Sequence, residues 1–406
     1  MSSRTIGRSE KSSLAGVRKL KVIRVVTSSE CVPWHLGNAL RRSPENFDVY
    51  VVGQNVSRHQ EKFPDVEFVD VDLDRKVNPI SDVFSLFKLC KIFLKYKPDI
   101  IHSIMPKAGL LTAIAGFICR VPVRIHTFTG QVWVTKKGLA RTVLYACDRL
   151  VNALNTACLT DSPSQSLFLF QHKIHCAGKP LSVLSKGSLS GIEMSRFNSQ
   201  AIGATAAKLR EDLGIDATDF VFAFIARKTR DKGAIDIIKG FQEVRRIFPE
   251  TKLLFVGPDE TGGEIEGMVR SNPEIFNNVM NIGRVDNHEL YLAISNVLCL
   301  PSYREGFGTI VIDAAALSVP TIGSDIVGLV DSIEDGETGI LFPAGDLSEL
   351  AKAMLFFLKN PERRVQMGLA AKQRVEAYFT ADQLYDALKN FYFECHGTVE
   401  VDRAPG

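Results

Sequence analysis

Residues 301–325 read PSYREGFGTIVIDAAALSVPTIGSD and place a glycine-bearing loop between two short apolar runs. The first run, 296–302, and the second, 320–325, have the length and the β-branched content of strands. The loop spans 305–308, and a helix is predicted to start near Thr309. Strand, helix and strand in this order predict a parallel sheet, because parallel neighbours need a crossover connection.

The same alternation continues along the whole chain, in two halves. Continuous apolar runs separated by helix-length segments suit strands that are buried on both faces of a parallel sheet. These runs are 21–29, 47–53, 99–104, 123–128, 157–162 and 181–187 in the first half, and 220–226, 252–257, 279–283, 296–302, 320–325 and 338–343 in the second. The sequence therefore predicts an α/β protein with two Rossmann-like domains, joined by a linker within 188–218.

Several charged side chains follow these strands, where the ligands of such sheets bind. Glu305 and Asp313 could hold hydroxyl groups at the two ends of one ligand, or could be a solvated loop charge and a helix-dipole residue. Arg227 and Lys232 suit phosphate, although a solvated basic loop would look the same. His126 is expected to face the cleft, with a satisfied core histidine as the alternative.

Six motifs occur in order along the chain. They are HSIMPKAG at 102–109, IHTFTG at 125–130, SKGSLSGIE at 185–193, GRV at 283–285, PSYREGFG at 301–308 and DGETGILFPAGD at 335–346. Together they resemble the retaining GT-B glycosyltransferases of family 4, and in particular the bacterial branch that builds capsule, O-antigen and glycan-lipid chains. The resemblance covers about residues 20–395. It implies the GT-B fold, in which two Rossmann-like domains have parallel sheets that face a central cleft.

The resemblance also implies a division of the chain. Residues 1–20 are expected to be a disordered basic tail. Residues 21–198 would form an acceptor-binding domain, and residues 199–376 would form the domain that binds the nucleotide sugar. Residues from about 377 to 400 would cross back to the first domain.

Site roles follow from the resemblance as well. Glu305 and His126 would be catalytic, with Glu305 on the hydroxyls of the donor sugar. Asp313, which stands where the family has a glutamate, would hold the ribose, and Arg227 and Lys232 would neutralise the donor diphosphate. The other implied donor contacts are Val285 near the base and, along the glycine loop, Gly306, Phe307, Gly308, Thr309 and Ile310.

No metal and no cofactor is expected. Asp70, Asp72 and Asp74 spell the metal motif of other glycosyltransferases, but the run VEFVDVDLD alternates like a half-exposed strand. Cations and the helix N-terminus at Thr309 can stabilise a leaving diphosphate without a metal. The histidines and cysteines lack zinc-ligand spacing, and no G-x-G-x-x-G follows the first strand, which argues against a nicotinamide enzyme.

Charge is distributed unevenly. Residues 1–200 carry 28 Lys and Arg against 15 Asp and Glu, whereas residues 201–406 carry 21 against 31. The basic half contains two segments with interleaved apolar residues, 83–97 (VFSLFKLCKIFLKYK) and 133–141 (WVTKKGLAR). Such segments suit an anionic membrane, although 83–97 could equally be a helix that packs on the sheet. The residues expected to contact acceptor or membrane are Lys107, Trp133, Lys136 and Lys137.

The predicted protein is a retaining glycosyltransferase. It would move a hexose or N-acetylhexosamine from a nucleotide sugar, UDP-linked, to a polyprenyl-diphosphate-linked saccharide. Eight cysteines without a C-x-x-C pair, and no secretory signal, favour a cytoplasmic protein held on the inner face of the cytoplasmic membrane. A nucleotide-sugar epimerase of the same fold and a non-catalytic scaffold of a glycan assembly complex remain as alternatives, and nucleic acid is not an expected partner.

Overall fold

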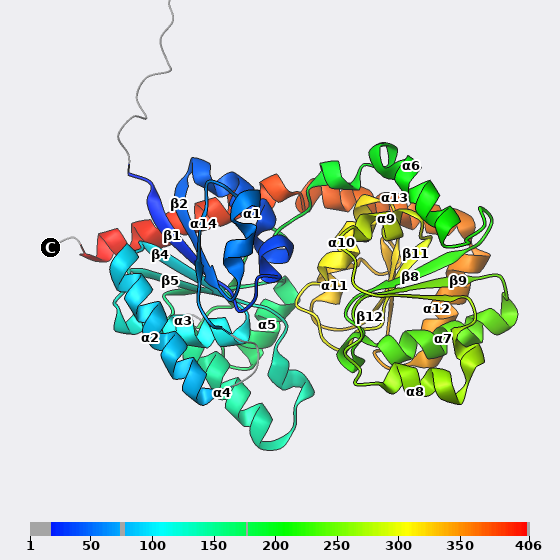
Figure 1. Cartoon of the computed structure of the whole chain (residues 1–406), viewed down its shortest axis with the longest axis horizontal. Coiled ribbons are helices and arrows are strands. Elements are labelled where there is room, and N and C mark those ends of the chain that lie inside the picture. The colour runs from blue at the N-terminus through cyan, green and yellow to red at the C-terminus, as the bar shows by residue number, and fades with distance from the viewer. Residues whose placement is uncertain (1–17, 74–77, 176–177, 404–406) are drawn as a thin grey trace, which may run out of the picture.

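The computed structural model describes residues 18–73, 78–175 and 178–403, with side chains described as far as Val399. The predicted tail, 1–20, therefore lies outside the described residues up to position 17. Two parallel sheets stand side by side, each with helices on both faces (Figure 1). The α/β fold class with two Rossmann-like domains is confirmed. No helix within the described residues is long and apolar enough to cross a membrane.

The first sheet has seven strands in the order β3-β2-β1-β4-β5-β6-β7. Their bounds are β1 (Leu20–Val25), β2 (Phe47–Gly53), β3 (Glu67–Asp70), β4 (Ile100–Ile104), β5 (Val123–Phe128), β6 (Ala157–Thr160) and β7 (Ser182–Val183). β1 pairs with both β2 and β4, so the strand order reverses there. Ligands of open parallel sheets bind beyond the carboxyl ends of the strands at such a reversal.

Helices cover both faces of the first sheet. One face carries α2 (Pro79–Tyr96), α3 (Pro106–Ile118) and α4 (Gly138–Leu154), which lie side by side (Figure 1). The other face carries α1 (Gly37–Arg42) and α14 (Ala381–Arg403), while α5 (Pro163–Gln171) packs near β6. A π-helical turn, η1 (Val32–Leu36), precedes α1. Within the described residues, the 3₁₀ turns are η2 (Ser43–Glu45), η3 (Val56–Lys62), η4 (Val132–Thr135), η5 (Met194–Phe197), η6 (Arg230–Lys232) and η7 (Pro273–Phe276).

The second sheet repeats this plan with six strands in the order β10-β9-β8-β11-β12-β13. The strands are β8 (Val221–Ile225), β9 (Lys252–Val256), β10 (Val279–Ile282), β11 (Val297–Leu300), β12 (Thr321–Ser324) and β13 (Gly339–Phe342). One face packs on α6 (Ser199–Asp212), α9 (His288–Ala293), α10 (Thr309–Ala316) and α13 (Pro361–Tyr378), and the other on α7 (Ala234–Ile247), α8 (Glu264–Ser271) and α12 (Leu347–Lys359). A single turn, α11 (Leu329–Ser332), follows β12.

The C-terminal helix α14 returns from the second half of the chain to the first sheet (Figure 1). Tyr385, Leu388 and Tyr392 are buried in the same core as Val22 and Phe47. The Tyr392 hydroxyl lies 2.7 Å from Nδ1 of His102, in the middle of β4. The two halves are therefore joined by a buried, partly polar contact as well as by the linker.

Each predicted apolar run contains a strand, but several strands are shorter than the runs. The run 21–29 ends as a strand at Val25, because the chain then turns into η1. The alternating run 66–74 forms β3 only as far as Asp70, and Asp74 lies outside the described residues. The helix predicted from Thr309 is α10, and it starts at that residue.

Candidate active site

The loop between β11 and α10 brings backbone N–H groups and a carboxylate to the end of the second sheet. Gly308 precedes the helix with φ +83°, in the left-handed region that glycine adopts without strain. A Cβ on Gly308 would also lie 2.6 Å from Leu329 Cδ2. The free N–H groups of the first turn, at Thr309 and Ile310, favour an anion at this point.

Glu305 is held by two donors. Lys232 Nζ lies 2.5 Å from Glu305 Oε1, and Ser302 Oγ donates to the same oxygen at 2.9 Å. Only 20% of the Lys232 side chain and 10% of the Glu305 side chain are exposed. The structure thus brings together a cation and a carboxylate that lie far apart in sequence, beside the N-terminus of α10.

Arg227 points elsewhere in this structure. Its Nη1 lies 2.6 Å from Glu260 Oε2, across the loop that follows β9. The next residue, Lys228, is buried, and its Nζ donates to Asn281 Oδ1 at 2.6 Å and to the Ile282 carbonyl at 2.8 Å. Burial lowers the pKa of Lys228 to about 8. Lys228 therefore ties the loop after β8 to β10, a role that the sequence did not indicate.

Asp313 has a partner that the sequence analysis missed. His288, at the start of α9, places Nε2 3.0 Å from Asp313 Oδ2. Val285 lies three residues earlier and is half-buried against the core beside α9. The adjacent Arg284 forms an ion pair with Glu30 of the first half and stacks on Trp34, 5.3 Å from the ring centroid.

Loops from the two sheets meet at a tight contact that we call the seam. The seam consists of Gly130, Asp161 and Gly187, which follow β5, β6 and β7, and of Gly306, Phe307 and Gly328, which follow β11 and β12. A Cβ on Gly306 would lie 2.1 Å from Asp161 Oδ2 and 2.9 Å from the Gly130 nitrogen. The close approach of two backbones explains why glycine occupies this position.

Side chains cross the seam as well. Arg304 Nη1 donates to the Gly130 carbonyl at 2.8 Å. Ser164 at the start of α5 donates its backbone N–H to Asp331 Oδ2 at 2.9 Å and accepts from the Gly328 N–H at 2.8 Å. The loop that carries Glu305 is therefore enclosed by residues of the first half.

Phe307 does not offer its side chain to a ligand. The ring is 3% exposed and packs on Phe379, with 5.3 Å between the ring centroids. The donor contact expected at Phe307 would therefore be made by its backbone and not by its ring. Only the backbone of Phe307 lies along the loop.

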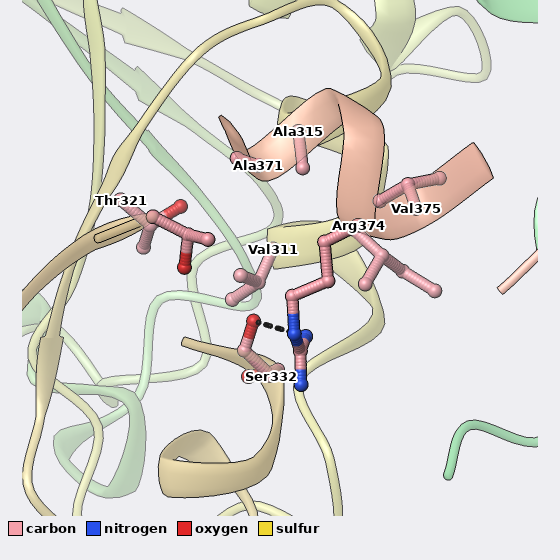
Figure 2. Close-up of a pocket in the computed structure, with 9 residues that line it drawn as sticks. Val311, Ala315, Thr321, Ser332, Ala371, Arg374 and Val375 are labelled. Carbon is pink, nitrogen blue, oxygen red and sulfur yellow. Dashed lines mark hydrogen bonds between the residues drawn. The ribbon is translucent and has the colours of Figure 1, made fainter. Parts of the chain in front are cut away.

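A small polar cavity lies behind α10, between that helix and α13 (Figure 2). Arg374 of α13 crosses it and donates to the carbonyls of Asp331 at 2.7 Å and Ser332 at 3.3 Å. These bonds fix the C-terminal end of α11, whose Leu329 packs against Gly308. The residues that line this cavity therefore hold α10 in position.

His126 corrects another expectation. The residue lies within β5, two positions before its end, and is 2% exposed. Its Nδ1 is 2.9 Å from Ser103 Oγ, its ring packs edge-on against Phe128, and a Cβ on Gly109 of α3 would touch it. The expectation that His126 faces the cleft is wrong, because α3 covers that face of the sheet. Gly130, after the strand end, reaches the Glu305 loop instead.

Buried neutral histidines make a pH-dependent contribution to stability. Burial lowers the pKa of His126 to about 3, whereas an unfolded histidine titrates near 6.5. Between these values the unfolded chain binds more protons, so stability falls as the pH falls below about 6.5. His126→Gln should reduce the slope of the unfolding free energy between pH 6 and 4.5 by about 1.4 kcal/mol per pH unit, measured by urea denaturation. An unchanged slope would contradict the buried, neutral state.

The residues expected to contact acceptor or membrane divide into two groups. Trp133 is 2% exposed, stacks on Phe168 and donates Nε1–H to Asp148 at 2.8 Å, so its assignment to a membrane contact is wrong. It is a core residue because η4 turns its ring inward. Lys136 and Lys137 are exposed, next to two exposed apolar residues, Val134 (44%) and Leu139 (79%). Lys107 forms an ion pair with Asp82 at 2.5 Å.

Two of the three aspartates that spell a metal motif, Asp70 and Asp72, are engaged by protein groups, and Asp74 lies outside the described residues. Asp70 accepts from the backbone and hydroxyl of Ser57, and Asp72 pairs with Lys88 at 2.8 Å. Within the part of the chain that the structure describes, no three His, Cys, Asp or Glu side chains are grouped as metal ligands.

Comparison with known proteins places these features in a family. The model for glycosyl transferases group 1 matches residues 206–374, and the model for the glycosyl transferase 4-like domain matches residues 31–172. CapM of Staphylococcus aureus, a capsular polysaccharide biosynthesis glycosyltransferase, is 30% identical over 388 residues, which is 93% of this chain and 97% of that protein. An Escherichia coli enzyme, UDP-Gal:alpha-D-GlcNAc-diphosphoundecaprenol alpha-1,3-galactosyltransferase, is 22% identical, over 79% of this chain and 82% of its own.

Solved structures share the fold. Sucrose-phosphate synthase from Thermosynechococcus elongatus superimposes with a TM-score of 0.77 at 20% identity, covering 94% of this chain and all of that chain. HepE from Anabaena, in complex with UDP and glucose, gives 0.77 at 16% identity over 92% of this chain and all of its own. Two Rossmann-like domains of this arrangement define the class as a GT-B glycosyltransferase. The chain belongs to the glycosyl transferases of group 1.

Proposed function

We propose that this glycosyltransferase is a retaining enzyme of surface polysaccharide assembly. It transfers a hexose or N-acetylhexosamine from a UDP-sugar to a polyprenyl-diphosphate-linked saccharide. The observation that carries the proposal is the Lys232–Glu305 pair beside the N-terminus of α10, at the seam between the halves. A carboxylate suits sugar hydroxyls, and an ammonium with free N–H groups suits a departing diphosphate.

The donor is assigned to the second half of the chain, residues 199–376. Asp313, positioned by His288, would take the ribose, and Val285 would pack near the base. Arg227 would exchange Glu260 for a phosphate, which it can bind bidentately. Support for UDP comes from two other proteins: the E. coli relative uses UDP-Gal, and HepE binds UDP.

A binding experiment tests this donor site. UDP should raise the melting temperature more than GDP, ADP, CMP or NAD, because a ligand at about 100 times its dissociation constant adds about 2.7 kcal/mol to a folded protein. EDTA should leave the shift unchanged, since Lys232 and the α10 N-terminus supply the charge that a metal would supply. A shift that EDTA abolishes would contradict metal independence.

The acceptor is assigned to residues 21–198 together with about 377–400, at the inner face of the cytoplasmic membrane. The helix α2 turns Leu89 and Phe93 into the core but leaves Phe84 (65%), Phe87 (63%) and Leu94 (62%) exposed. The segment 83–97 therefore packs one face on the sheet and exposes a strip of apolar side chains on the other. Lysines at 88, 91 and 95 accompany that strip, which suits an anionic lipid surface.

Liposome flotation tests the membrane contact. Replacement of both Phe84 and Phe87 by serine should lower partition onto phosphatidylglycerol vesicles about tenfold or more, since each phenylalanine loses its apolar burial in the interface. A control variant replaces both Val365 and Leu369 by serine. These two apolar side chains are also exposed, but on α13 (50% and 52%). If the two double variants bound the vesicles to the same extent, or if binding did not weaken with added salt, this face would be excluded as the membrane contact.

A further inference from the structure

Asp161 is a buried carboxyl group without a role in the mechanism described so far. It follows β6 directly and is 5% exposed. Its backbone is fixed on both sides, because its N–H donates to Gln165 Oε1 at 2.9 Å and its carbonyl accepts from the Ser188 N–H at 2.8 Å. The side-chain Oδ1 is buried and has no hydrogen-bond partner among the described residues.

The carboxyl group of Asp161 lies at the seam, against the turn that carries Glu305. A Cβ on Gly306 would come within 2.1 Å of Asp161 Oδ2, so the two groups are in direct contact. Lys232 pairs with Glu305. Arg304 bonds through Nη1 to the Gly130 carbonyl and through Nη2 to Asp231, while its buried Nε has no hydrogen-bond partner among the described residues.

Two neighbouring carboxyl groups of which only one is paired with a cation favour different protonation states. Glu305 holds the cation. Burial, and then the negative charge of Glu305, hold the pKa of Asp161 well above its ordinary value. Two further carboxylates near this loop have partners of their own: Asp331 accepts from the Ser164 N–H, and Asp231 pairs with Arg304. These surroundings favour the neutral form of Asp161, which has an O–H to donate.

We propose that Asp161 is a sugar-binding residue of the donor site, whose side chain donates a hydrogen bond to one hydroxyl of the donor sugar. The inference rests on the proposed UDP-sugar function. A sugar hydroxyl both accepts and donates, so one hydroxyl can accept from Asp161 and donate to Glu305. The buried side chain of Asp161 thus gains its missing hydrogen bond only when the bound sugar carries a hydroxyl group that reaches it. Sugars without that hydroxyl should bind more weakly, so Asp161 would determine specificity.

The test separates the sugar from the nucleotide. Calorimetry gives the dissociation constants of UDP and of UDP-glucose, UDP-galactose, UDP-N-acetylglucosamine and UDP-N-acetylgalactosamine. The ratio of the UDP constant to that of the tightest UDP-sugar is the gain from the sugar. Asp161→Asn keeps a donor of the same shape and should keep the gain within about threefold, whereas Asp161→Ala should lower it about tenfold or more. UDP itself should bind both variants as it binds the wild type.

A pH series adds a readout that a purely structural role would not move. As the pH rises and Asp161 loses its proton, the gain of the wild type should fall, while the gain of Asp161→Asn stays flat. Lys228, with its pKa of about 8, also titrates in this series. Its titration should change the affinities for UDP and for UDP-sugars by the same factor, so the ratio of the two dissociation constants should not change.

The opposite results are equally clear. A gain that survives Asp161→Ala, or a panel in which no sugar adds affinity to UDP, overturns the role of Asp161 and leaves the UDP site standing. Failure of UDP to bind the wild type contradicts the proposed function itself. A cooperative melt of Asp161→Asn shows that the fold is intact in the variant that carries the comparison.

Discussion

Replacement of Glu305 by alanine should reduce sugar transfer on the order of 10³-fold, the upper range for loss of one preorganised polar group in an active site. The carboxylate is 10% exposed and bound to Lys232 and Ser302, so it is fixed before the donor arrives. Alanine removes the acceptor for the sugar hydroxyls and releases the lysine from its position near the diphosphate. The measurement is initial-rate transfer with the UDP-sugar selected by binding.

A neighbouring acidic residue provides the control for Glu305. Glu264 also pairs with a basic side chain of the β8–α7 loop, Arg230, at 2.8 Å, but outside the seam. Glu264→Ala should transfer sugar at the wild-type rate. Circular dichroism and a cooperative melt should show that Glu305→Ala is folded. Normal turnover by Glu305→Ala would disprove the assignment of the site.

Replacement of Tyr392 by alanine should destabilise the protein by about 3–5 kcal/mol, as large-to-small changes of aromatic core residues do. Tyr392 is 2% exposed, packs edge-on against Phe47 at 5.5 Å and satisfies His102 Nδ1. Alanine leaves a cavity under α14 and an unpaired imidazole nitrogen in β4. Since a domain is stable by only about 5–15 kcal/mol, urea denaturation should detect a large shift.

Two further variants separate packing from hydrogen bonding at this contact. Tyr392→Phe keeps the ring and loses only the hydroxyl, so the loss should be about 1 kcal/mol. Phe393→Ala truncates the next residue, which also contacts Phe47 but is 46% exposed, and should have less than half the effect of Tyr392→Ala. Equal losses at 392 and 393 would contradict the packing of α14 on the first sheet.

The sheet architecture could be predicted from the sequence because parallel strands buried on both faces are continuous apolar runs. Each predicted run contains a strand, and the two halves follow the same order. The ends of strands were less predictable: 181–187 contains only the two-residue β7. Strand length there depends on pairing with β6, which no local pattern encodes.

The candidate site was predictable where loop chemistry determines it. A glycine loop before a helix, with Glu305 in it, marks the place, and the structure adds Lys232 at 2.5 Å. Orientation was not predictable. In a strand buried on both faces, alternation does not tell which side a helix covers, so His126 was expected to face the cleft and is a core residue. Trp133 is a core residue because the turn η4 directs its ring inward, which the sequence pattern did not indicate.

Contacts between the halves could not be predicted at all. Asp161 and Gly306 are far apart in sequence, and only the folded chain brings them together. The glycine loop marks Gly306, but no local signal marks Asp161, which reads as an ordinary polar residue before Ser162, the N-cap of α5. The contact of His288 with Asp313 lies within the second half, but it could not be predicted either, because the two residues stand on different helices.

One transfer assay tests the central proposal most directly. The purified protein is given the UDP-sugar that binds best, a polyprenyl-diphosphate-linked saccharide and EDTA, and the anomeric configuration of the product is read by NMR. A glycosylated lipid that keeps the α configuration of the donor, formed in EDTA and lost in Glu305→Ala, is the predicted result. Inverted product, a strict metal requirement, or conversion of the UDP-sugar without any acceptor would contradict it.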